Sequence, residues 1–183
     1  MFKRIACALV VLFAVGAVAA ASDRWLHVRV ESFDKDKENV RINLPLSLVE
    51  QLIPAIETKE FRGGRIQLGK GKLNGIDLRR IITAVNQMPD SEFVTVQTGN
   101  QNVRVAKANG YLTVTTDGNS KDAKVNARIP MAVVTALVSG GTDELDLLAA
   151  IRALSAHGDG ELVTVDDKDN RVRVWIDGQN TSK

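Results

Sequence analysis

Cysteine and histidine are nearly missing from this sequence of 183 residues. Cys7 is the single cysteine, and His27 and His157 are the only histidines. Zinc sites need clusters of these ligands, and a lone cysteine forms no disulfide within the chain. The patterns Gly-x-Ser-x-Gly and His-Glu-x-x-His are also absent. We therefore expect a non-enzymatic protein with no catalytic residues, no metal and no cofactor.

The first 21 residues contain no acidic side chain. Lys3 and Arg4 precede an apolar core, Ile5–Phe13, and a run of small residues ends at Ala21. This order is typical of a secretory signal peptide, here 1–21, and predicts export to the periplasm or the extracellular space. An uncleaved anchor is the alternative, although the alanine-rich stretch is marginal for crossing about 30 Å of hydrocarbon. After cleavage, no stable membrane span is expected.

The exported chain has no net charge of either sign. Lys3 and Arg4 account for the formal charge of +2, so 22 basic residues remain against 22 acidic ones. A balanced chain lacks the basic field that attracts nucleic acid or anionic lipid. We expect no nucleic-acid partner.

The sequence lacks these catalytic motifs but contains a long internal repeat. Residues 76–107 align with residues 145–176 at an offset of 69 residues without a gap, and Val40–Leu46 resembles Val125–Met131 at an offset of 85. The difference marks an insertion within residues 54–75 of the first copy. The sequence thus predicts a signal peptide at 1–21, a first unit at 22–108, a second unit at 109–178 and a polar tail at 179–183.

Each unit has the pattern of an α+β module of order ββααββ. Alternation of apolar and polar residues predicts strands, for example Leu26–Val30, and a 3.6-residue period predicts helices. Pro45 suits a first helical turn and Asp77 suits an N-cap. The helical stripes would be formed by Leu46, Val49, Leu52, Ile53 and Ile56, and by Leu78, Ile81, Ile82 and Val85.

The two units are joined by Asn109-Gly110, a strong hairpin signal. We therefore expect the last strand of the first unit to pair with the first strand of the second. The fold class predicted is α+β, with two tandem ββααββ repeats, antiparallel sheets and helices on one face. Both units would share one sheet or two abutted sheets.

Several segments together resemble a known type of protein. They are Trp25–Val30, Val40–Val49, Phe93–Val96, Asn102–Lys107 and Val172–Asp177. The chain resembles uncharacterised exported bacterial proteins. It is also similar to the small domain that accompanies helical hairpins in some bacterial envelope-stress proteins. The resemblance implies a bacterial, exported and non-enzymatic protein, and it brings no site residues.

The insertion is the first candidate binding site. Its stretch from Arg62 to Gly75 contains five glycines, no acid and four cations, which are Arg62, Arg65, Lys70 and Lys72. Backbone amides of such a loop can cradle an anion. The alternative is an exposed β-hairpin anchored by Ile66, Leu68 and Leu73.

The open face of the sheet is the second candidate. Strand alternation puts aromatic and arginine side chains there, the composition of interface hot spots. The residues are Trp25, His27, Arg29, Arg41, Arg104, Arg173 and Trp175. Alternatively, this face is simply solvated, or the tryptophans seal the contact between the units.

The leading hypothesis for function is an exported binding or adaptor module that contacts an envelope protein or an anionic polymer. The second is a structural component that self-associates as a homo-oligomer through an open sheet edge. An enzyme would need His27 to meet Glu161 or Asp166 between the units. Asp34–Glu38 and Asp166–Asn170 have oxygen ligands for calcium, but Asp and Asn are also ordinary turn residues.

Overall fold

The computed structural model describes residues 23–33, 39–68, 77–98, 101–118, 123–141 and 143–182. The predicted signal peptide, the acidic segment Asp34–Glu38, and Lys70, Lys72 and Leu73 lie outside the described residues. The predictions made for them therefore stay predictions.

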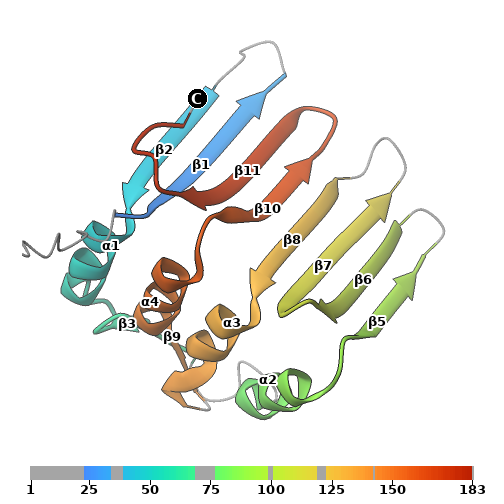
Figure 1. Ribbon diagram of the computed structural model, residues 1–183, viewed down its shortest axis with the longest axis horizontal. Helices are drawn as coiled ribbons and strands as arrows, with labels where there is room; N and C mark the ends of the chain where they lie inside the picture. The colour runs from blue at the N-terminus through green and yellow to red at the C-terminus, as the bar shows by residue number, and fades with distance from the viewer. Residues whose placement is uncertain are drawn as a thin grey trace, which may run out of the picture.

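An antiparallel sheet of eight strands forms the body of the molecule (Figure 1). Alternating apolar residues give each strand one apolar and one polar face. The strands lie in the order β2 (Asn39–Pro45), β1 (Trp25–Ser32), β11 (Asn170–Asp177), β10 (Gly160–Asp166), β8 (Lys124–Pro130), β7 (Tyr111–Gly118), β6 (Gln101–Ala108) and β5 (Ser91–Gln97). Both halves of the sequence contribute to this one sheet, which is the first of the two arrangements that the sequence left open.

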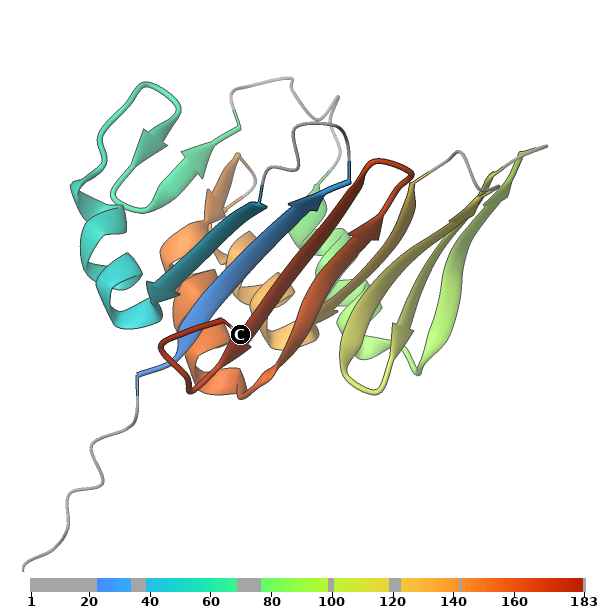
Figure 2. The same ribbon diagram turned by 90° about the horizontal axis from the view of Figure 1, so that it is seen from above.

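Four α-helices lie on one side of the sheet, near one end of its strands (Figure 2). They are α1 (Leu46–Leu52), α2 (Leu78–Gln87), α3 (Met131–Leu137) and α4 (Leu147–His157). Short 3₁₀ turns, η1 (Ile53–Ala55) and η2 (Val138–Gly140), continue α1 and α3. Mixed strands and helices make the fold α+β.

Two kinds of residue precede the helices. Pro45 and Pro130 occupy the N-cap positions of α1 and α3 without a side-chain hydrogen bond, so Pro45 lies just before the first helical turn where it was expected. The Asp77 carboxylate accepts a hydrogen bond from the Arg80 amide at 3.0 Å, and that of Asp146 accepts one from the Ala149 amide at 2.8 Å. The predicted N-cap at Asp77 is confirmed.

The turn between β6 and β7 is the predicted Asn109-Gly110 hairpin. Both residues have positive φ, 51° and 78°, as a type I′ turn requires. The Ala108–Tyr111 pair closes the hairpin, so the two halves of the sequence meet without a linker.

The described part of the insertion forms a hairpin and joins a second, three-stranded sheet. Its strands are β3 (Phe61–Arg62), β4 (Arg65–Gln67) and β9 (Glu144–Asp146). The Gly64 carbonyl accepts hydrogen bonds from the Leu147 and Leu148 amides at 3.0 and 3.1 Å. The first half is thereby attached to the start of α4, a contact that the sequence did not predict.

The core sits where the helices meet the sheet. Its buried cluster contains Leu46, Leu154, Leu162 and Ile176. The predicted helical stripes are only partly buried, since Leu52, Ile56 and Ile81 are about half exposed. The reason is that α3 and α4 pack on each other, whereas α1 contacts α4 and α2 contacts α3. Within the described residues, the outer sides of α1 and α2 pack on no further helix.

Candidate functional site

The polar face of the large sheet carries a line of arginines. Strand register places Arg41 beside Arg29 and Arg29 beside Arg173. The same line continues through Thr164, Asn126 and Thr115 to Arg104. We call Arg41, Arg29, Arg173 and Arg104 the arginine row. The sequence assigned these residues to one face, and register adds that they share one line across it.

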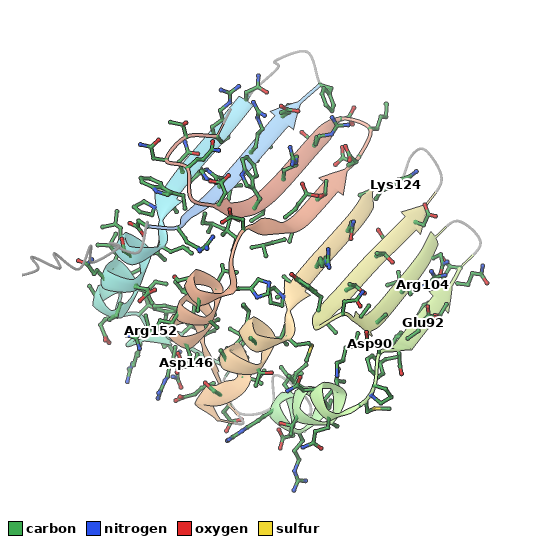
Figure 3. All side chains as sticks on the ribbon, in the orientation of Figure 1. Asp90, Glu92, Arg104, Lys124, Asp146 and Arg152 are labelled. Carbon is green, nitrogen blue, oxygen red and sulfur yellow. The ribbon has the colours of Figure 1, made fainter. Side chains whose placement is uncertain are left out.

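Three of the four arginines have carboxylate partners. The Arg173 guanidinium donates two hydrogen bonds to Glu161, at 2.7 and 2.9 Å. Arg104 pairs with Glu92 at 2.8 Å (Figure 3), and Arg29 pairs with Glu31 at 3.3 Å. Hydrogen bonds from Arg173 and Thr164 hold the pKa of Glu161 below its ordinary value. These pairs are exposed or partly exposed, so solvent screens them and a stronger acidic partner can compete.

A shallow hollow of about 390 Å³ opens in the middle of this face. Cations, carboxylates, hydroxyls and amides line it together. Its polar lining includes Asn102, Arg104, Thr115, Asp117, Lys124, Asn126, Thr164 and Asp166. The mixture suits a polar ligand that carries groups of both charges and hydrogen-bonding groups.

The end of the polar face that carries the two tryptophans is less open to solvent than the sequence predicted. His27 is fully buried, so the prediction that it lies on an open face is wrong. Its ring stacks on Trp175 at 4.9 Å between centroids, and Arg173 lies 5.3 Å from the Trp175 ring centroid. Trp25 and Trp175 are half-buried. Only part of the predicted aromatic surface is therefore open to a partner.

The two side chains that contact the nitrogens of His27 also hold the C-terminal tail. Asn43 accepts hydrogen bonds from the Ser182 amide and faces His27 Nδ1 at 2.6 Å. Asp177 faces His27 Nε2 at 3.1 Å and accepts bonds from Trp175 Nε1 and the Gln179 amide. A histidine satisfied on both nitrogens and closed off from solvent has a structural role. The hypothetical meeting of His27 with Glu161 or Asp166 is not seen among these contacts.

Acid should release the tail. Burial raises the pKa of Asp177, but hydrogen bonds from Gln179, His27 and Trp175 outweigh this and lower the pKa overall. A lowered pKa means that Asp177 stabilises the fold above its ordinary range, and this contribution disappears as the pH falls through the lowered value. In a Trp25→Phe background, Trp175 fluorescence should therefore change in strong acid. The matched variant Asp177→Asn should lack this step, and an identical titration in both would contradict the assignment.

The basic insertion is partly occupied by internal contacts. Arg65 bridges to Asp146 at 3.1 Å and to Glu144 at 3.6 Å, so it fastens β4 to β9. Arg62 is exposed, and Lys70 and Lys72 lie outside the described residues. The described part of this segment therefore forms a β-hairpin, which was the alternative to an anion-binding loop.

The acidic segment Asp166–Asn170 and the second histidine both make ordinary structural contacts. Asp167 accepts bonds from the Asp169 and Asn170 amides, which makes Asp166–Asn170 an ordinary turn. The second histidine, His157, ends α4 and contacts the Tyr111 hydroxyl at 2.9 Å. Across the described ranges, no three metal-ligating side chains gather, and no helix is long and apolar enough to cross a membrane.

Comparison with known proteins finds a family match for one part of the chain. Residues 24–106 match the family described as the C-terminal domain of YvlB-like proteins. This covers most of the first half and supports a small domain of uncharacterised type. Neither the curated proteins nor the solved structures contain a match to the chain.

Proposed function

We propose that this protein is an exported, non-enzymatic binding module that holds an acidic ligand on the polar face of its large sheet. The ligand is a segment of an envelope protein or an anionic polymer. The arginine row is the observation that carries the proposal, because it aligns four guanidinium groups along one line across the strands. The site is the row together with the hollow beside it.

Spacing and chemistry favour an extended ligand. Adjacent strands lie about 4.8 Å apart, so Arg41, Arg29 and Arg173 repeat at intervals suited to successive acidic groups. Arginine binds carboxylate or phosphate through two parallel hydrogen bonds. The alternating carboxylates Glu31 and Glu161 keep the face electrically mixed and would select for the pattern of charges.

We also propose that the two halves arose by duplication of a ββααββ unit. Glu92 and Arg104 form the same ion pair in the first half as Glu161 and Arg173 in the second, 69 residues apart. Strand β5 and strand β10 have a register shift at equivalent places. These parallels support the division into two units that was proposed from the sequence.

A pull-down from the bacterial envelope tests the binding site. Tagged protein is crosslinked in four forms. The binding of each form to polyglutamate, a defined acidic probe, is measured in parallel. The first is unchanged, the second carries Arg104→Ser and Arg173→Ser, and the third carries Arg80→Ser and Arg152→Ser. The third is a matched control, since it removes the same charge from exposed positions on α2 and α4.

Loss of two arginine contacts should weaken polyglutamate binding at least about tenfold in the second form, since each charge-assisted hydrogen bond contributes about 1.5–3 kcal/mol. The control should bind as the unchanged protein does. Equal binding by all three forms would refute the polar-face site. A fourth form, with Arg62, Lys70 and Lys72 changed to Ser, assigns the site to the insertion if it alone loses the partner.

Self-association is a second candidate function, because exposed apolar side chains concentrate on the two outer strands of the sheet.

A further inference from the structure

The two edge strands of the large sheet, β2 and β5, display valine, isoleucine and leucine to solvent. Val40, Ile42, Leu44, Val94 and Val96 are between 38% and 48% exposed. Each of these strands has a neighbour on one side only. An open edge with apolar side chains is a template for another strand, and most proteins avoid one.

A pairing that fits these two edges already exists inside the chain. Strand β8 pairs with β10 in antiparallel register, with Ala127 opposite Val163 and Val125 opposite Val165. The sequence of β2 corresponds to that of β8, and the sequence of β5 to that of β10. The register shift at Glu92/Val94 of β5 recurs at Glu161/Val163 of β10. Strands β2 and β5 thus correspond in sequence to two strands that pair with each other in the second half of the chain.

Within this chain they cannot meet as the sheet stands. Six strands lie between β2 and β5, which places them roughly 34 Å apart in a flat sheet of this size. Figure 2 shows the sheet open, with β2 at one end and β5 at the other. A strand that pairs with either edge must therefore come from another molecule.

The helices lack partners in the same way. Helix α3 follows β8, α4 precedes β10, and the two pack on each other. Their counterparts α1 and α2 stand apart, and their outer sides are exposed at Leu48, Leu52, Ile81 and Met88. Pairing β2 of one chain with β5 of another would bring an α1 and an α2 into the relation that α3 and α4 have. The junction would then bury helix surface as well as strand edges.

We propose that a second copy of this chain is the partner, and that β2 of one copy pairs with β5 of the next in the register of the β8–β10 pair. Ile42 then lies opposite Val94, Arg41 opposite Thr95, and Val40 opposite Val96. No like charges face each other in this register. The contact is head-to-tail, so every chain keeps one more free edge and the contact repeats as a ring or filament.

This inference develops the second candidate function and does not depend on ligand binding at the arginine row. Its experiment uses cysteine pairs, so its failure is distinguishable from failure of the polar-face site. All variants carry Cys7→Ser, which makes the introduced thiols the only ones. Chains with Ile42→Cys are mixed with chains carrying Val94→Cys and oxidised mildly, and Arg41→Cys with Thr95→Cys samples the adjacent ladder position.

Matched pairs bring Cβ atoms about 4.5–5.5 Å apart, whereas a register shifted by two residues separates them by about 7–8 Å. The mixture of Ile42→Cys and Val94→Cys chains should give at least about tenfold more mixed disulfide than Leu44→Cys with Val94→Cys, the shifted control. Sedimentation of the unchanged protein should show concentration-dependent oligomers, and Val40→Lys should reduce them while circular dichroism stays the same.

Two results would overturn the proposal. One is the absence of mixed disulfide at both matched positions. The other is closure of Ile42→Cys and Val94→Cys within a single chain that carries both, since this would mean that the sheet closes on itself into a barrel.

Discussion

Replacing Leu46 with alanine should lower the free energy of unfolding by about 3 kcal/mol, as expected for removing a buried leucine side chain from a packed core. Leu46 is completely buried, and it packs with Leu154, Leu162 and Ile176. It lies directly after Pro45 at the start of α1, and its amide donates to the Arg24 carbonyl at 2.7 Å. The side chain joins the first half of the chain to strands and a helix of the second half.

Chemical denaturation followed by circular dichroism measures this change. Leu52→Ala is the matched control, since it removes the same atoms from the same helix at a position that is 54% exposed. It should cost less than about 1 kcal/mol in dilute protein. Similar losses for both variants would mean that α1 is not anchored through Leu46.

Replacing Gly64 with alanine should destabilise the fold by about 2–3 kcal/mol, through strained backbone and overpacking. Gly64 has a φ of 81°, and an added Cβ would lie 2.8 Å from the Leu148 Cβ and 3.1 Å from a methyl group of Ile53. Its carbonyl also accepts the first amides of α4. The substitution should therefore loosen the β3–β4 hairpin from the helix.

The neighbouring glycine provides the control for this prediction. Gly63 also has a positive φ, 54°, but no atom lies within 4 Å of its added Cβ. Gly63→Ala should therefore cost only about 1 kcal/mol, the penalty of the left-handed conformation. Hydrogen exchange should accelerate at the Leu147 and Leu148 amides in Gly64→Ala alone. Equal effects of the two substitutions would refute the close contact.

Local structure was predictable because it depends on neighbours in the sequence. Alternation gave the strands, proline and aspartate gave the helix starts, and Asn109-Gly110 gave the central hairpin. Each signal acts over a few residues, through backbone conformation or a single hydrogen bond. The arginine row also follows from alternation, although only the register places its members on one line.

The errors concern contacts between distant residues. Alternation assigned His27 to the polar side of its strand but could not show that Asp177, 150 residues later, contacts its ring there and that the ring is buried. Periodicity marked Leu52 and Ile81 as apolar but could not say that both stay about half exposed among the described residues. The joining of β4 to β9 rests on three residues in each strand, too few to leave a pattern in the sequence.

The order of strands also governs when the protein can fold. Trp25, in the first strand, pairs with Asp177, in the last, so the interior of the sheet depends on contacts across almost the whole chain. Such distant pairing is slow, because a long loop must close before the contact stabilises anything. Strands β5 to β8 can pair with one another early, and so can β1 with β2, whereas the β1–β2 hairpin joins the rest of the sheet only after β11 has been made. A growing chain therefore cannot complete its eight-stranded sheet until its synthesis ends, and until then the first hairpin lacks its inner neighbour.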